Sequence, residues 1–121
     1  MTSQLAGYHV LLVEAPPAGG LFAEALLAAL GCVVVGPVDD LDVAYRMGIS
    51  APIDAALLDS RIGSEALSIL CNILTRRRVP FVVASGNSDV RLPEKWRDCP
   101  LLPKPYNMAE LREALIRATT R

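Results

Sequence analysis

Five short apolar runs recur along the chain, and each is followed by polar or turn-forming residues before the next segment begins. The runs occupy residues 8–13, 32–35, 55–59, 80–84 and 101–102. Runs of this length with such boundaries are typical of buried strands. Strands that alternate with helices build a parallel sheet with helices on both faces. The sequence therefore predicts an α/β fold, and for 121 residues we expect a doubly wound five-stranded parallel sheet of order 2-1-3-4-5.

Helices are predicted between and after these runs, over residues 21–30, 40–47, 64–78 and 107–118. The second helix is expected to begin at Asp39 or Asp40, and the third at Ser64. Asn107 is expected to cap the last helix, with Glu110 as its capping-box partner. Gly36–Pro37 is expected to end the second strand. Residues 87–99 are expected to be irregular, with a degenerate fourth helix at most.

Composition excludes several classes of protein. Hydrophobic residues make up 52% of the chain, which argues against disorder, and 12 Lys and Arg against 13 Asp and Glu leave a net charge of −1. This balance predicts neither a nucleic-acid-binding nor a membrane-binding surface. The odd set of distant cysteines, Cys32, Cys71 and Cys99, favours reduced thiols in a cytoplasmic protein over disulfides or a zinc site. We expect one cytoplasmic domain over residues 1–121, with its core at about 8–118.

Asp59 ends the apolar run 55–59 and is the first candidate for a functional residue. Open α/β sheets bind ligands at the edge formed by the carboxyl ends of their strands. In the predicted strand order, Glu14 would lie beside Asp59 at this edge, with Ser85 and Lys104 on neighbouring strands. From these residues alone a second interpretation stays open, in which Asp59 only ends the strand or caps the next helix.

The motifs at these strand ends resemble those of the bacterial response-regulator receiver domain, which has the CheY-like fold. In chain order they are Leu-Leu-Val-Glu at Glu14, Leu-Leu-Asp at Asp59, Ala-Ser-Gly at Ser85 and Lys-Pro at Lys104. The resemblance covers nearly the whole chain. Residues 83–86, Val-Ala-Ser-Gly, also partly resemble the FATGUY subgroup of receivers, whose fourth helix is degenerate.

The resemblance implies a site for phosphoryl transfer in a two-component system. Asp59 would be the phosphoacceptor, taking a phosphoryl group from a phosphohistidine of a sensor histidine kinase or a phosphotransfer protein. Lys104 and Ser85 would bind the phosphoryl oxygens. Glu14, Asp59 and the backbone carbonyl of Arg61 would hold Mg²⁺, a cation that prefers oxygen ligands.

Four further expectations follow from comparing the chain with the family pattern. Receivers normally have a second acidic residue after the first strand, where this chain has Ala15, so Mg²⁺ is expected to bind weakly. The guanidinium of Arg61 is an alternative cation, because it could swing into the acidic pocket. The aromatic switch residue that many receivers carry is Leu101 here, so a change is expected to propagate through Ser85 and residues 86–99 instead. The Lys104–Pro105 peptide bond is expected to be cis.

Two functions remain open. The first is a single-domain response regulator that is phosphorylated on Asp59, signals by protein–protein contact in a phosphorelay, and has at most autophosphatase activity. No output domain is expected, because the chain ends at Arg121. The second is a pseudo-receiver, an interaction module that has lost Mg²⁺-dependent phosphorylation, and Ala15 favours it. A small flavin carrier is disfavoured, because the loop after the first strand lacks Ser and Thr donors for a phosphate.

Three other features are interpreted as structural. His9 is the only histidine, and it lies in the first strand, away from the candidate site. The arginines at 76–78 are expected to form a solvated helix end, with an acidic partner as the alternative. Trp96 is expected to cover apolar side chains.

Overall fold

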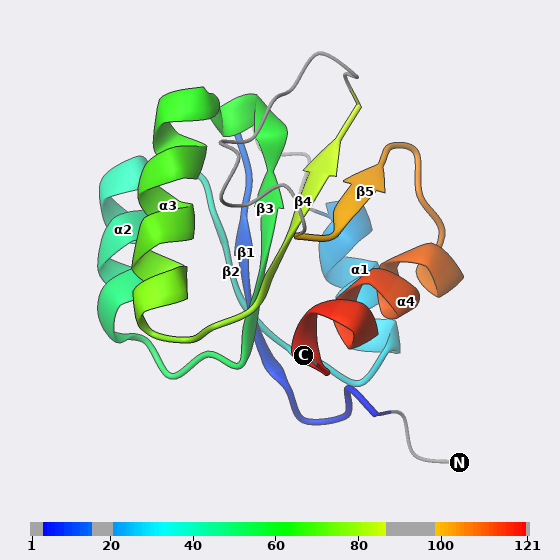
Figure 1. The fold of residues 1–121 in the computed structure, drawn as a ribbon. Coiled ribbons are helices and arrows are strands. Elements are labelled where there is room, and N and C mark those ends of the chain that lie inside the picture. The colour runs from blue at the N-terminus through cyan, green and yellow to red at the C-terminus, as the bar shows by residue number, and fades with distance from the viewer. Residues whose placement is uncertain (1–3, 16–20, 87–98, 121) are drawn as a thin grey trace.

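The computed structural model describes residues 4–15, 21–86 and 99–120, and it confirms the expected doubly wound fold. The strands form one parallel sheet of order β2-β1-β3-β4-β5, with helices on both faces (Figure 1). The strands are β1 (His9–Val13), β2 (Val33–Val38), β3 (Ala55–Asp59), β4 (Phe81–Ser85) and β5 (Leu101–Pro103). The helices are α1 (Leu21–Ala29), α2 (Leu41–Ser50), α3 (Ser64–Arg76) and α4 (Met108–Thr119), with a short 3-10 turn, η1 (Ser60–Ile62), after β3.

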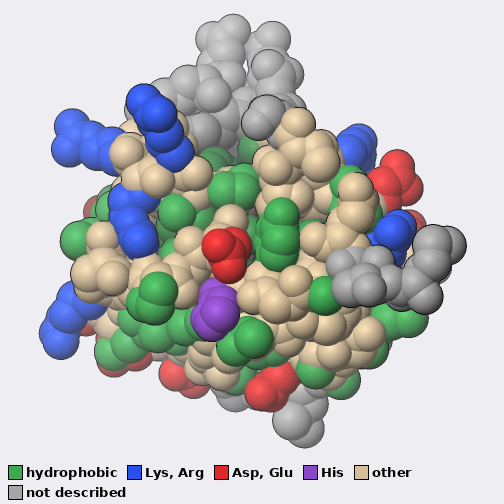
Figure 2. All heavy atoms as spheres, turned by 90° about the horizontal axis from the view of Figure 1, so that it is seen from below, with side chains coloured by type: hydrophobic (Ala, Val, Ile, Leu, Met, Phe, Trp, Pro, Cys, Tyr) green, Lys and Arg blue, Asp and Glu red, His purple; other side chains and the backbone are tan. Residues whose placement is uncertain are grey.

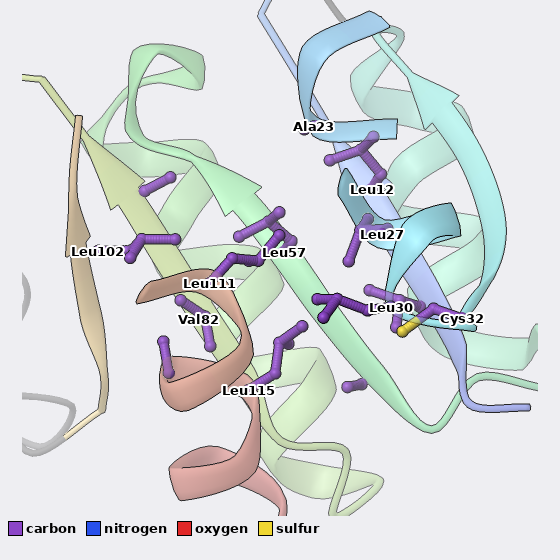
Figure 3. Packing of buried hydrophobic residues seen from close by; sticks show 14 of the residues in the cluster. Leu12, Ala23, Leu27, Leu30, Cys32, Leu57, Val82, Leu102, Leu111 and Leu115 are labelled. Carbon is purple, nitrogen blue, oxygen red and sulfur yellow. The ribbon is translucent and has the colours of Figure 1, made fainter. Parts of the chain in front are cut away.

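The sheet separates two layers of buried side chains. Along β3, which is buried throughout, Leu57 faces the layer under α1 and α4, while Leu58 faces the layer under α2 and α3. Figure 3 shows the first layer, where Leu27 of α1 and Leu111 of α4 pack over the sheet. Because successive residues of a strand point to opposite faces, one continuous apolar run supplies both layers. Full burial of each leucine stabilises the fold by about 1.5–3 kcal/mol.

Strand β2 continues beyond the predicted break. It does not end at Val35 but passes through Gly36–Pro37 and ends at Val38, so that expectation is wrong. Pro is tolerated in edge strands and at bulges, and β2 is an edge strand whose register with β1 shifts at this point. Gly36 has a φ of 114°, and a Cβ there would lie 2.8 Å from the carbonyl oxygen of Leu12. Only Gly fits this position without a shift of the backbone.

Helix caps agree with the sequence at two of the three predicted sites. The Asp40 carboxylate accepts a hydrogen bond from the backbone N–H three residues on, at 3.1 Å. Asn107 and Glu110 exchange the two bonds of a capping box, at 2.8 and 3.0 Å. The third expectation is wrong, because the N-cap of α3 is Gly63 and Ser64 is the first residue of the helix.

Arg77 connects the two helices that cover one face of the sheet. Its Nη1 donates to the carbonyl oxygen of Gly48 at 2.6 Å, and its Nη2 donates to that of Ala51 at 2.9 Å. The last carbonyls of a helix have no partner within it, so this guanidinium caps the carboxyl end of α2. Arg76 and Arg78 are exposed, as a solvated helix end requires, but for Arg77 that expectation is wrong.

His9 lies at the opposite edge of the sheet from the candidate site. Its backbone N–H donates to Asp54 Oδ2 at 2.8 Å, and its Nδ1 lies 3.6 Å from the same oxygen. Figure 2 views this lower face and shows the histidine at the surface with an acidic side chain beside it. The contact joins the starts of β1 and β3, so the structural interpretation of His9 is confirmed.

Two further features are absent from the described part of the chain, namely disulfide bonds and membrane-spanning helices. Cys32, Cys71 and Cys99 form no disulfide bonds within the described residues, as expected. Burial, and then the proximity of Cys99, raises the pKa of Cys71 to about 12, so this thiol stays protonated at neutral pH. None of the described helices is long and apolar enough to cross a membrane. The degenerate helix predicted between the fourth and fifth strands falls in residues 87–98, outside the described ranges. Trp96, which is expected to cover apolar side chains, lies in the same segment.

Candidate functional site

Strand pairing brings the predicted side chains to one edge of the sheet. Glu14 follows β1, Asp59 ends β3, Ser85 ends β4 and Lys104 follows β5. In the sheet register, Asp59 is level with Ala84, one residue before Ser85. These are the carboxyl ends of neighbouring parallel strands, at the top of the sheet in Figure 1. The structure therefore places all four residues where the sequence predicts them.

Asp59 is a buried carboxylate held by two cations. Only 5% of the residue is exposed. Its Oδ1 accepts from the backbone N–H of Arg61 at 3.0 Å and lies 3.1 Å from Lys104 Nζ. Its Oδ2 accepts from Nε and Nη2 of Arg61, at 3.2 and 3.1 Å. Burial acts to raise the pKa of Asp59, but the Arg61 and Lys104 hydrogen bonds outweigh it, so the pKa lies below its ordinary value.

The backbone bond from Arg61 also makes Asp59 the N-cap of η1. Part of the second interpretation left open by the sequence is therefore confirmed, because Asp59 caps the turn that follows its strand. Capping does not exclude a functional role, because the capping bond uses one lone pair of one oxygen. Capping orients the carboxylate, since it fixes the side chain against the backbone of the turn.

Glu14 is the second carboxyl group of the site, and it is incompletely paired. The residue is 7% exposed, and within the described residues its Oε1 has no hydrogen-bond partner. Burial first, and then the charge of Asp59, raises its pKa above the ordinary value. A buried acceptor without a partner costs about 1–3 kcal/mol. Such an oxygen marks a place where a cation or a hydrogen-bond donor would be stabilised.

Lys104 is positioned by both its neighbours along the chain and the adjacent strand. Its backbone N–H donates to the carbonyl oxygen of Ser85 at 2.9 Å, and the Lys104–Pro105 peptide bond is cis, as predicted. Ser85 is half-buried at the end of β4. Leu101, which stands where many receivers have an aromatic switch residue, is 48% exposed.

The donors at this edge fit a hard divalent cation in part. Glu14 offers an unpartnered oxygen, and Asp59 offers a second carboxylate. The described residues contain no group of three or more Asp, Glu, His or Cys that could hold a metal ion. The Arg61 guanidinium lies on Asp59 Oδ2, as the alternative from the sequence proposes, and its side chain is 57% exposed. The residues thus fit Mg²⁺ only when this guanidinium moves toward solvent.

Sequence reasoning missed Tyr106 and Phe22. Tyr106 is 7% exposed, and burial, followed by the charges of Glu14 and Asp59, raises its pKa to about 12. Its ring lies 5.5 Å from that of Phe22, centroid to centroid, at 55°. Both line a cavity that also borders Asp59. An aromatic residue directly after Lys-Pro was the available signal for Tyr106, whereas the position of Phe22 depends on how α1 packs.

Solved structures show what this chain is similar to. The receiver domain of the sensor histidine kinase PA1611 from Pseudomonas aeruginosa is 30% identical, with a TM-score of 0.76 over 96% of this chain and 100% of that chain. SdrG from Sphingomonas melonis is 34% identical, with a TM-score of 0.77 over 91% of this chain and 94% of that chain. The stress response regulator PhyR is 21% identical and shares the fold, with a TM-score of 0.73, over 46% of its own length.

Comparisons at the sequence level find less. No model of a known protein family matches the chain, and no curated protein matches it either. The FATGUY resemblance stays a prediction, because residues 87–98 lie outside the described ranges. The fold, the strand-end residues and two receivers of at least 30% identity that are covered over nearly their whole length agree with one another. The chain therefore belongs to the family of response-regulator receiver domains, which have the CheY-like fold.

Proposed function

We propose that this receiver accepts a phosphoryl group on Asp59 from a phosphohistidine of a sensor histidine kinase or a phosphotransfer protein, and signals by protein contact. The observation that carries the proposal is the Asp59 carboxylate, buried at the end of the central strand and 3.1 Å from Lys104 Nζ. Its lowered pKa keeps it ionised at neutral pH, as a nucleophile must be. We further propose that the protein acts as a single cytoplasmic domain that does not bind nucleic acid. We propose that it is not an enzyme and has at most autophosphatase activity.

The chemistry assigns a role to each side chain. An oxygen of Asp59 attacks phosphorus, the bond from phosphorus to the donor imidazole nitrogen breaks, and that nitrogen keeps the electron pair and takes a proton. Lys104 lies close enough to Asp59 to neutralise charge on the arriving phosphoryl oxygens. We assign to Ser85, at the end of the adjacent strand, the donation of a hydrogen bond to one of them. Glu14, Asp59 and the backbone carbonyl of Arg61 would hold Mg²⁺. The bound ion would reduce the repulsion between the Asp59 carboxylate and the phosphoryl group.

Support for the metal comes from the site and from a relative. The unpartnered oxygen of Glu14 requires a cation or a donor, and the PA1611 receiver has a magnesium ion coordinated in its active-site cleft. Ala15 supplies no carboxylate, so we propose that Mg²⁺ binds this chain weakly.

The test is treatment with acetyl phosphate and Mg²⁺, followed by intact mass measurement. The wild-type protein should gain the mass of one phosphoryl group, and Asp59→Asn should gain none. Asp54→Asn is the matched control, because Asp54 lies at the opposite edge of the sheet and pairs with His9; this variant should still be modified. Absence of modification in the wild type, or equal modification of Asp59→Asn, would contradict the proposal.

A second function, the pseudo-receiver, is favoured by one observation. Arg61 donates twice to Asp59 Oδ2, so the chain's own guanidinium neutralises the carboxylate without a metal. In that case the protein would be an interaction module in which Arg61 permanently neutralises the charge of Asp59. The two functions differ in what happens when the guanidinium is removed.

Mg²⁺ titration and phosphorylation of Arg61→Ala and Ala15→Asp separate the two functions. Each substitution should tighten Mg²⁺ binding by roughly ten- to a hundredfold, since one removes a competing cation and the other restores a carboxylate. A phosphorylatable wild type supports the response regulator. A wild type that is inert while both variants accept phosphoryl groups supports the pseudo-receiver. Unchanged Mg²⁺ affinity in both variants would show that the metal pocket is assigned wrongly.

A further inference from the structure

A cavity of about 360 Å³ opens beside Asp59, between the amino end of α1 and the segment that precedes α4. Its floor is the sheet, formed by Leu12, Leu57 and Ala84 from three adjacent strands. Its walls include Phe22, Ala23 and Tyr106. Concave, largely apolar cavities of this size with a few polar groups at one end are typical of small-molecule sites.

Small residues leave this space open. Ala23 on α1 and Ala84 on β4 border the cavity with a single methyl group each, and both are buried. Leu12 and Leu57 are directly paired across β1 and β3, so they form a continuous apolar floor. Figure 3 shows Leu12, Ala23 and Leu57 on this side of the sheet, in the same buried layer as Leu27 and Leu111.

Phe22 indicates the direction from which the cavity is entered. Its ring packs against Tyr106 at one edge, yet 55% of the residue is exposed. A large apolar side chain that is half-exposed at the mouth of a cavity would lose unfavourable contact with water if an apolar molecule covered it.

The polar end of the cavity determines which chemical group fits. The oxygens of Asp59 are already paired with Arg61 and Lys104. Glu14 lines the same cavity, and only 7% of the residue is exposed. Within the described residues its Oε1 nevertheless has no hydrogen-bond partner. In the metal-free protein, a ligand that supplies a hydrogen-bond donor would satisfy this oxygen.

Mg²⁺ fits this end only when the Arg61 guanidinium moves toward solvent, and while Arg61 pairs with Asp59 the charge balance disfavours any further cationic donor. Glu14 and Asp59 bring two negative charges when ionised, and Arg61 and Lys104 bring two positive charges. A third cation at this end would be repelled by two neighbouring cations, while an anion would be repelled by the two carboxylates. A neutral N–H or O–H group satisfies Glu14 without disturbing the balance.

We propose that this cavity is a binding site for a small neutral aromatic molecule with a single hydrogen-bond donor, which the molecule directs to Glu14 Oε1. The ring occupies the space over Leu12 and Leu57, against the side chains of Ala23 and Tyr106. The proposal concerns binding alone and requires no phosphorylation of Asp59.

The probe is indole, compared with 1-methylindole, in titrations of the full chain in metal-free buffer followed by two-dimensional amide NMR. The two compounds share the ring, but only indole carries an N–H. Loss of one hydrogen bond to a buried acceptor should weaken binding by about tenfold. Amide signals of α1 and of residues 104–106 should shift, and those of α2 should not. Equal affinity for the two compounds, or shifts confined to other regions, would overturn the proposal.

Substitutions locate the contact. Glu14→Leu should abolish the preference for indole, and Glu14→Gln, which keeps an acceptor oxygen, should retain it. Glu113→Leu is the matched control on the exposed side of α4 and should behave as the wild type does. Ala23→Leu should weaken both compounds by about tenfold, because it fills the cavity. A preference for indole that survives Glu14→Leu, or full affinity in Ala23→Leu, would contradict the site. Each variant is first shown to be folded by an amide spectrum that matches that of the wild type.

Discussion

On one face of the sheet α2 and α3 touch each other, whereas on the other face a cavity lies between the amino end of α1 and the segment that precedes α4. Gly48 allows the close approach on the first face, because a Cβ there would lie 3.2 Å from a methyl group of Ile73. Arg77 then bonds the end of α2 to α3. We call these the closed face and the open face.

The open face carries the groups that are incompletely satisfied. Glu14 has an unpartnered oxygen and Phe22 exposes an aromatic ring, while on the closed face Leu70 and Leu74 are fully buried. Incomplete packing and pairing lower stability, and they occur where a protein has a use for space and charge. Fully buried leucines fill both faces, among them Leu111 on the open one. The difference teaches that unfilled space and incomplete pairing lie together at the end of the open face that carries the candidate site.

The largest expected effect compares leucines on the two faces. Leu70→Ala on the closed face should lower the free energy of unfolding by about 3–5 kcal/mol, because it creates a new cavity in a filled layer. Leu12→Ala on the open face should cost less, about 2–3 kcal/mol, because this side chain already borders empty space. Urea unfolding followed by circular dichroism measures both. An equal or larger loss for Leu12→Ala would break the comparison.

Arg77 tests the connection between α2 and α3. Arg77→Ala should lower the free energy of unfolding by about 1–3 kcal/mol, since two carbonyl oxygens of α2 lose a charged donor. The exposed neighbour provides the control, and Arg76→Ala should change stability by less than about 0.5 kcal/mol. If both variants lost the same amount in urea unfolding, the closed face would not depend on this guanidinium.

Glu14 gives the open face a dependence on pH. Its pKa is raised in the folded state, so the folded protein binds more protons than the unfolded chain above pH 4.5, and this group makes stability fall as pH rises through that window. Glu14→Gln should remove the slope and be more stable than wild type at about pH 7, by on the order of 1 kcal/mol. The gain should shrink toward pH 4.5.

Thermal unfolding at several pH values measures this difference. Asp59 acts in the opposite sense, because its lowered pKa gives stability that is present above the ordinary value of 3.8 and is lost as pH falls through the folded value. The comparison of Glu14→Gln with wild type is therefore made above that range. A difference that is constant with pH would show that Glu14 does not titrate as described.

The smallest expected effect lies at the end of α3. Arg78 has a φ of 60°, in the left-handed region that favours Gly. Arg78→Gly should therefore raise the free energy of unfolding by about 0.5–1 kcal/mol. The same change inside the helix, Arg76→Gly, should lower it by a similar amount, about 0.5–1 kcal/mol. Opposite signs in urea unfolding confirm the assignment, and a loss for both variants would refute it.

Much of the fold could be predicted because it depends on local signals. The apolar runs, the Asp40 cap and the Asn107–Glu110 capping box are all readable from neighbours in sequence. The extension of β2 through Gly36–Pro37 was not, because a proline is tolerated there only through the position of β2 at the edge of the sheet. Tolerance of that kind is a property of the assembled sheet.

The candidate site divides in the same way. Asp59, Ser85 and Lys104 could be placed because each ends or follows a strand, and parallel strand ends meet at one edge. The two bonds from Arg77 to α2 and the cavity beside Tyr106 could not, because they join segments that approach each other only in three dimensions. The swing of Arg61 onto Asp59 was expected only as one of two alternatives, since sequence spacing fixes its backbone and not its side chain.

The pairing of Arg61 with Asp59 has a consequence for timing. Under the phosphorylation of Asp59 proposed above, a donor would reach Oδ2 only during intervals when the guanidinium points to solvent, so the rate of attack by Oδ2 would equal its intrinsic rate multiplied by the fraction of time the arginine is away. Dissolved ions screen a half-exposed pair of this kind and lengthen those intervals. Added salt would then accelerate modification of Asp59 by a small donor, although it slows the encounter of oppositely charged proteins.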